Sequence, residues 1–127
     1  MFGKLNVAME RIELTKAEEQ IMYILWRLER GFVKDVIKEL SSPKPAYNTV
    51  STIIRILVDK KIVSYKAYGK THEYFPVISK DDYSKQKMGE VMSKLFDGSP
   101  RKMLSFLVKK EELSIEDLDD IMKTLKK

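Results

Sequence analysis

Residues 46–76 read AYNTVSTIIRILVDKKIVSYKAYGKTHEYFP, and this stretch decides the fold. In its first half, apolar residues recur at the i, i+3, i+4 and i+7 spacing of one buried face of an α-helix. These residues are Val50, Ile53, Ile54 and Leu57. In its second half, residues 62–66 and 71–75 flank a turn at 67–70 centred on Gly69, which predicts a two-stranded hairpin. The stretch therefore predicts an amphipathic helix followed at once by a hairpin.

The opposite face of this helix carries hydrogen-bonding side chains and little charge: Asn48, Thr52, Arg55 and Asp59, with Ser51 beside them. Residues 44–72 hold six Lys or Arg against one acid, whereas residues 80–127 hold 11 bases and 10 acids. Since the net charge of the whole chain is +5, the positive excess is concentrated on this segment. A hydrogen-bonding helix beside a basic hairpin predicts a surface that enters a DNA groove and contacts the flanking phosphates.

Two further helical patterns precede this stretch. Thr15 followed by Glu18 is a capping-box signal for the start of the first helix, and Gly31 is its expected end. The apolar stripes are Ile21, Ile24, Leu25 and Leu28 in the first helix and Val33, Val36, Ile37 and Leu40 in the second. Residues 41–45 contain two prolines and must form a turn, while residues 1–13 are expected to be a short arm. Three helices and a two-stranded wing in this order describe a winged helix-turn-helix.

From residue 79 the pattern is helical to the end, with breaks at Asp97–Gly98 and a capping signal from Ser114 to Asp117. Three short helices bury too little surface to close a core within one chain. We therefore expect a homodimer, with an interface made by Met88, Val91, Met92, Leu95, Leu118, Ile121, Met122 and Leu125. The predicted fold class is mainly α with a β wing: a DNA-binding domain at 1–78 and a three-helix dimerisation domain at 79–127.

Composition narrows the possible functions. The 127 residues are 43% hydrophobic, enough for a packed core, and contain no cysteine, which excludes disulfides and thiolate chemistry. No apolar run approaches the ~18 residues that span a bilayer, and residues 1–10 lack a signal-peptide core. We expect a cytoplasmic protein that does not insert into membranes. His72 is the only histidine and is expected to be a half-buried strand residue, so the sequence predicts neither an enzyme nor a metal or other cofactor.

Helix and hairpin supply the candidate DNA contacts. Arginine can pair with guanine, asparagine with adenine, and a threonine methyl can touch the thymine methyl, so the polar helix face is expected to read bases. Lysines and a tyrosine of the hairpin are expected to contact phosphates. The first tyrosine of the helix is interpreted as a phosphate contact, with a lid on the core as the alternative. The full set is Tyr47, Asn48, Thr49, Ser51, Thr52, Arg55, Lys66, Tyr68 and Lys70.

Five short motifs follow one another along the chain: AEEQIMYILW at 17–26, TVST at 49–52, GKTHEYFP at 69–76, LFDGS at 95–99 and ELS at 112–114. In this order they resemble the penicillinase and methicillin-resistance repressor family (BlaI/MecI) over nearly the whole chain. Two positions depart from that pattern. The family usually has Arg where Ile56 stands, one residue after Arg55, and often has Gly where Lys61 stands. A shift of one residue turns a side chain by about 100° around a helix.

The resemblance implies a bacterial transcriptional repressor that binds a symmetric double-stranded DNA operator as a homodimer. It also implies derepression by a membrane-bound sensor metalloprotease, which would cut the dimerisation domain at the position of Ser105–Phe106. Serine stands here where well-known members commonly have asparagine. The related copper-responsive branch uses C-terminal cysteines, which this chain lacks. An alternative reading is a winged helix that serves only as a protein–protein interaction module, which would need no basic wing.

Overall fold

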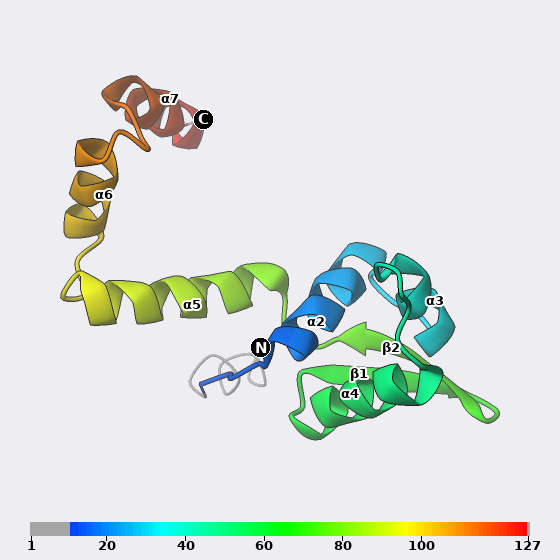
Figure 1. The fold of residues 1–127 in the computed structure, drawn as a ribbon. Helices are drawn as coiled ribbons and strands as arrows, with labels where there is room; N and C mark the ends of the chain where they lie inside the picture. Colours follow the sequence, from blue (N-terminus) through cyan, green and yellow to red (C-terminus); the bar gives the residue numbers. More distant parts are fainter. Residues whose placement is uncertain (1–10, 127) are drawn as a thin grey trace. The chain divides into compact units, whose positions relative to one another are not determined.

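The computed structural model describes residues 11–126 and is mainly helical (Figure 1). Its elements are α2 (Lys16–Leu28), α3 (Val33–Glu39), α4 (Tyr47–Asp59), β1 (Val63–Tyr68), β2 (Thr71–Pro76), α5 (Lys80–Leu95), α6 (Pro100–Lys109) and α7 (Ile115–Leu125). The internal contacts divide the chain into two units, Met1–Gln86 and Lys87–Lys127. The domain boundary expected between residues 78 and 79 stays a prediction. Most of the arm expected over residues 1–13 lies outside the described residues.

The start of α2 confirms the predicted capping box. The backbone N–H of Glu18 donates to Thr15 Oγ1 at 3.1 Å, and the N–H of Thr15 donates to Glu18 Oε1 at 3.0 Å. The Glu18 carboxylate is buried and also accepts a bond from Lys60 Nζ at 2.6 Å. Lys60 is the C-terminal cap of α4, and it donates further to the carbonyl of Glu13 at 3.0 Å. This contact ties the end of α4 to the start of α2.

We expect Lys60→Met to lower the free energy of unfolding at pH 7 by about 1–2 kcal/mol, less than for a fully buried pair because the lysine is partly exposed. Burial raises the pKa of Glu18, but the bonds from Lys60 and Thr15 outweigh it, so the pKa lies below the ordinary 4.5. A depressed pKa stabilises the fold above about pH 4.5 and ceases to do so as the pH falls through the folded-state value.

Urea unfolding of wild type and variant at pH 7 and at about pH 3 tests this expectation. The difference between the two proteins should shrink at the lower pH. Arg27→Met is the matched control, because its ion pair with Glu39 is more than one-third exposed on both sides, and it should change stability little. A difference for Lys60→Met that is the same at both pH values would contradict this account.

The end of α2 differs from the prediction, which placed it at Gly31. The helix ends at Leu28, and Glu29 turns the chain with a φ of 73°. Gly31 instead pairs with the wing: its N–H donates to the Tyr74 carbonyl at 2.9 Å, and the N–H of Tyr74 donates back at 2.8 Å. A β-carbon at Gly31 would lie 3.4 Å from Asp35 Cβ, which is ordinary van der Waals contact. The prediction was wrong because Glu29, a residue type that rarely adopts a positive φ, ends the helix before the glycine is reached.

The core of the first unit lies between α2, α3, α4 and the hairpin. The stripe predicted for α4 is confirmed, with Val50, Ile54 and Leu57 at most 1% exposed and Ile53 packed beside them. The stripes of α2 and α3 pack against it, and the core residues are Ile12, Ile21, Met22, Ile24, Leu25, Val33, Val36, Leu40, Val50, Ile54, Leu57, Ile62, Val63, Tyr74, Ile78 and Tyr83. This packing fixes which face of α4 remains at the surface.

The hairpin formed by β1 and β2 is called the wing below. Its strands are antiparallel, and Tyr68 pairs with Thr71, so only Gly69 and Lys70 form the turn. The predicted turn at 67–70 was therefore two residues too long. Gly69 has a φ of 64°, which suits glycine in a two-residue hairpin turn. The longer β1 extends the wing by two residues.

An aromatic cluster holds the first turn of α5 on α2. Trp26 Nε1 donates to the Ile78 carbonyl at 2.8 Å, and its ring lies 5.5 Å from that of Tyr83. The Tyr83 hydroxyl donates to Glu19 at 2.6 Å. Trp26 is half-buried and packs against the core.

In the second unit, the expected break at Asp97–Gly98 and the capping signal from Ser114 to Asp117 are confirmed. Ser114 and Asp117 form the capping box of α7, and Pro100 lies in the first turn of α6. No described residue of α6 or α7 is buried. Leu95 is 72% and Leu125 78% exposed, so both side chains are largely uncovered by the residues that the structure describes. The dimer interface stays a prediction.

Candidate nucleic-acid interface

The surface of α4 divides into two lines of side chains. The first, called the groove line, consists of Tyr47, Ser51 and Arg55, which lie four residues apart on one side of the helix. Arg55 Nη2 donates to Ser51 Oγ at 3.4 Å. The second, called the outer line, consists of Asn48, Thr49 and Thr52, which are exposed and do not line the cleft described below. The sequence treated these residues as one face.

The groove line forms one wall of a cleft on the protein surface, called the groove below, with a volume of about 640 Å³. Its other walls come from the start of α3 and from the wing, and its lining residues are Phe32, Val33, Lys34, Tyr47, Ser51, Arg55, Val58, Asp59, Tyr65, Lys70, Thr71, His72 and Tyr74. Three of these side chains are basic and one is acidic. Burial raises the pKa of Tyr74, a shift that nearby Arg55 opposes, so this hydroxyl stays neutral at physiological pH. The groove is therefore positively charged and lined by aromatic rings.

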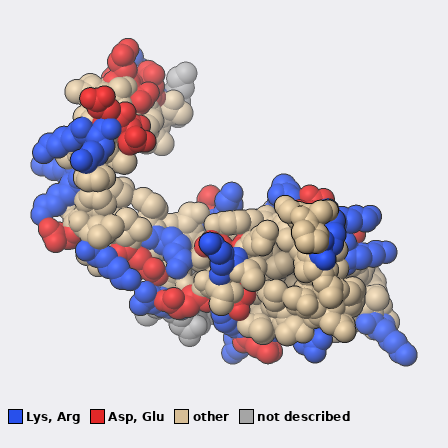
Figure 2. Space-filling model, viewed as in Figure 1, with Lys and Arg blue, Asp and Glu red and all other residues tan. Residues whose placement is uncertain are grey.

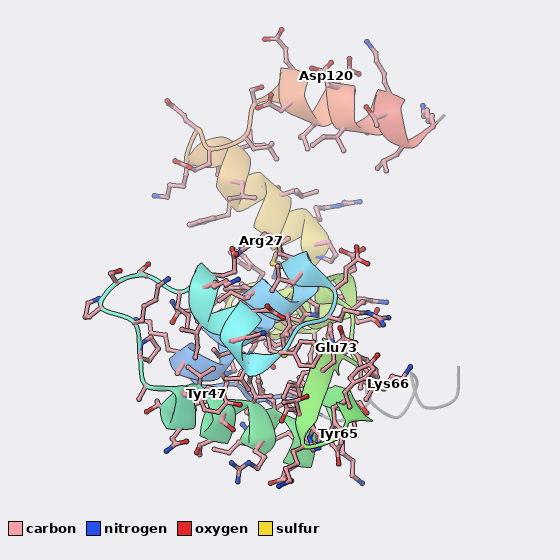
Figure 3. The ribbon with its side chains drawn as sticks, turned by 90° about the vertical axis from the view of Figure 1, so that its right-hand side faces the viewer. Arg27, Tyr47, Tyr65, Lys66, Glu73 and Asp120 are labelled. Atoms are coloured by element: carbon pink, nitrogen blue, oxygen red, sulfur yellow. The ribbon has the colours of Figure 1, made fainter. Side chains whose placement is uncertain are left out.

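The predicted phosphate contacts of the wing do not all lie on the same face of it. Tyr65 stacks on His72 with ring centroids 4.1 Å apart and lies 5.9 Å from the ring of Tyr74, and all three rings line the groove. Lys66 follows Tyr65 in the strand and therefore points to the opposite face. Figure 3 shows Tyr65 on the side of the wing next to α4 and Lys66 on the outer side. Of the predicted wing residues, only Lys70 lines the groove.

The outer face of the wing has its own network. Lys66 Nζ lies 5.3 Å from the centroid of the Tyr68 ring, and the Tyr68 hydroxyl donates to Glu73 Oε1 at 3.5 Å. Arg30, in the segment between α2 and α3, pairs with the same Glu73 carboxylate at 3.8 Å. Phe32 packs against Tyr68 at 6.0 Å between ring centroids. Lys66 and Tyr68 thus lie together, apart from Lys70.

Tyr47 is 56% exposed, which favours the phosphate contact over a lid on the core, and the contact itself stays a prediction. It lines the groove at the first turn of α4 (Figure 3). Sequence reasoning missed Arg30, Lys34 and Tyr65. Lys34 and Arg30 reach this region because the start of α3 packs beside the wing, and no local pattern signals that contact. Tyr65 alternates with Lys66 in the strand, so its opposite orientation was a usable signal.

Two of the six bases in residues 44–72 hold the fold together. Lys44 Nζ donates to the carbonyls of Lys38 and Leu40 at the end of α3, and Lys60 pairs with buried Glu18. The other four, Arg55, Lys61, Lys66 and Lys70, are exposed. Basic side chains cover the tip of the wing at the right-hand end of the view in Figure 2. The positive surface is therefore centred on the wing and on the groove beside α4.

Within residues 11–126, no three His, Cys, Asp or Glu side chains lie together in a way that would hold a metal ion. No helix of the described chain is long and apolar enough to cross a membrane.

A helix-turn-helix followed by a two-stranded wing is the arrangement of the winged-helix DNA-binding proteins, and in this chain a basic groove lies between helix and wing. The family model described as penicillinase repressor matches residues 14–127, and the chain belongs to this family of repressors. The resemblance seen in the motifs is thereby confirmed. The family is one of DNA-binding repressors and not of enzymes.

Three known proteins illustrate the relationship. The penicillinase repressor of Bacillus licheniformis is 25% identical over 118 residues, which cover 89% of each chain. The methicillin resistance regulatory protein MecI of Staphylococcus aureus (strain N315) is 23% identical over 116 residues, or 91% of this chain and 94% of that one. The solution structure of the DNA-binding domain of the repressor BlaI is 27% identical with a TM-score of 0.51, covering 58% of this chain and 92% of the other. The winged-helix fold is confirmed by this last match.

Proposed function

We propose that this protein represses transcription by binding a symmetric operator in double-stranded DNA as a homodimer. The observation that carries the proposal is the surface of α4, where an uncharged outer line lies beside the exposed Lys and Arg side chains of the groove and wing. A major groove about 12 Å wide accepts an α-helix, and the phosphates on its rim attract the Lys and Arg side chains that flank the helix. The related BlaI has a DNA-binding domain of the same fold. Such a repressor acts in the cytoplasm, where the operator lies.

The two lines of α4 support different contacts. Asn48, Thr49 and Thr52 are short, exposed and suited to base edges. Tyr47 and Arg55 flank a positive groove that can accept one backbone phosphate, with Lys70 on the opposite wall. We therefore favour a phosphate contact for Arg55, in place of the base contact expected from sequence. Lys66 and Tyr68, on the outer face of the wing, are proposed to contact a neighbouring phosphate.

The second unit supports dimerisation. All the exposed large apolar residues of α5 and α7 except Ile115 fall on the predicted interface: Met88, Val91, Leu95, Ile121, Met122 and Leu125, with Met92 and Leu118 half-buried. Stripes of exposed apolar side chains on helices, such as these, are typical of interaction sites. A second copy of the same helices would cover these residues, and a two-fold symmetric dimer would match a symmetric operator.

Derepression is proposed to follow cleavage of Ser105–Phe106 by a membrane-bound sensor metalloprotease, as the family resemblance implies. Both residues are exposed, and the bond lies inside α6. A helical bond must unwind before a protease can hold it in extended form, so local opening of α6 would precede the cut. Cleavage would detach α7 from the rest of the chain. The regulated genes would then be those of antibiotic resistance, as in the named relatives.

The salt dependence of DNA binding tests the proposal. Operator affinity should fall steeply as the salt concentration rises, because Lys and Arg side chains that bind phosphates displace condensed counterions. Changing Lys66 and Lys70 to Ala should flatten the plot of log K against log salt by roughly one unit for each phosphate that is no longer neutralised. Lys123→Ala, in α7, is the control and should leave the slope unchanged. Binding that is indifferent to salt would favour the alternative, an interaction module without DNA binding.

A further inference from the structure

Ile56 is an exposed aliphatic residue in the middle of α4. It is 39% exposed, although the other isoleucines of this helix pack in or against the core. Its position lies about 100° around the helix from buried Leu57, which places it outside the apolar stripe. It is also absent from the lining of the groove. Ile56 therefore belongs to the surface that carries the outer line.

Neither of the long side chains near Ile56 in the helix covers it. Arg55 donates to Ser51 on the groove side. Lys60, one turn later, is bound to Glu18 at 2.6 Å and to the carbonyl of Glu13. The aliphatic surface of Ile56 is thus left open beside Thr52, four residues earlier.

Thr49, Thr52 and Ile56 follow one another at the i, i+3 and i+7 spacing of one helix face. All three are β-branched and carry a methyl group close to the helix. In the major groove, the base edges present one apolar group, the C5 methyl of thymine, and hydrogen-bonding atoms elsewhere. An uncharged aliphatic side chain gains free energy only where it covers such a group.

We infer that Ile56 is a specificity-determining residue that contacts the C5 methyl of a thymine in each operator half-site. The inference rests on the proposed function, because it requires α4 to lie in the major groove. It assigns recognition of T·A at one position to apolar contact. Arg55 does not compete for that base, since its guanidinium lies on the groove side.

Replacement of thymine by deoxyuridine provides the test, because it removes only the methyl group and leaves base pairing intact. The preferred operator is first selected from random duplexes with the full-length protein, and each thymine of a half-site is then replaced in turn. Removal of one buried methyl group should raise Kd by about fourfold at one position, and replacing both symmetry-related thymines should raise it by about 15-fold. In Ile56→Ala the same replacement should have no effect, while Ile56→Val should keep part of it.

Val77→Ala is the matched control. Val77 is an aliphatic residue of the same unit, 52% exposed and outside α4, so its truncation should leave the deoxyuridine pattern unchanged. Circular dichroism and sedimentation establish that each variant keeps the fold and assembly of wild type.

Three results would overturn the inference while leaving the repressor proposal intact. One is a wild-type protein that binds its selected operator equally well with uracil at every position. Another is a selected half-site that contains no thymine. The third is a methyl effect that persists in Ile56→Ala, which would assign it to another residue such as Thr52. Failure of wild type to select any duplex would instead contradict the proposed function itself.

Discussion

Leu118→Asp should convert the protein to a monomer and weaken operator binding by ~10²–10⁴-fold, the range by which linked binding exceeds single-site binding. The reason is that Leu118 lies in the middle of the apolar stripe of α7, where a carboxylate would be buried against the second copy without a partner. Sedimentation gives the assembly state, and titration of a full operator and of a half-site gives the two affinities. The half-site affinity should stay close to that of wild type.

Thr124→Asp is the control for this substitution, because it adds the same charge to α7 at an exposed position outside the stripe. It should remain dimeric. A Leu118→Asp protein that stays dimeric would remove the proposed interface. A monomer that binds the full operator as tightly as wild type would separate repression from dimerisation, and cleavage at Ser105–Phe106 could then not act by splitting the dimer.

Arg55→Ala and Asn48→Ala should both weaken binding, by about 1–3 kcal/mol each, but in different ways. Removal of a phosphate contact made by Arg55 should weaken binding equally on operator and on unrelated DNA. Removal of a base contact made by Asn48 should weaken binding only on the operator and relax the preference at one position. Kd values for both variants on the operator, on single-base variants of it and on unrelated duplex measure this difference.

Tyr47→Phe serves as a companion, since it removes one groove hydroxyl and keeps the ring. Its effect should also be uniform across sequences and smaller than that of Arg55→Ala. If Arg55→Ala relaxes preference at a guanine while leaving non-specific binding intact, the arginine reads a base and the phosphate assignment of the groove is wrong.

Local signals made much of the fold predictable. The capping boxes at Thr15 and Ser114 depend on residues three apart, and both are present in the structure. The stripe of α4 depends on helical period alone, and its residues are buried as expected. The hairpin was found from alternation and Gly69, although the turn is shorter than predicted. Structural features that depend on residues close together in the sequence can be predicted in this way.

Contacts between distant segments explain what the sequence did not reveal. The pairing of Lys60 with Glu18 engages one basic side chain with a buried carboxylate, and it joins residues 42 positions apart. The division of the polar face of α4 depends on where the wing folds back, which no spacing within the helix specifies. For the second unit, the helices follow from local pattern, whereas local pattern does not specify what covers their exposed apolar faces.

The pairing of Gly31 with Tyr74 has a consequence for the thermodynamics of binding. A two-stranded hairpin alone is marginally stable in water, and its ordering on DNA would consume part of the interaction free energy. Here the reciprocal hydrogen bonds of 2.9 and 2.8 Å attach β2 to the segment between α2 and α3 before any partner arrives. The wing is thus preorganised, because the part of β2 that is attached to this segment has already lost its conformational entropy during folding. Contacts made by the wing can then contribute to affinity with little offset from ordering.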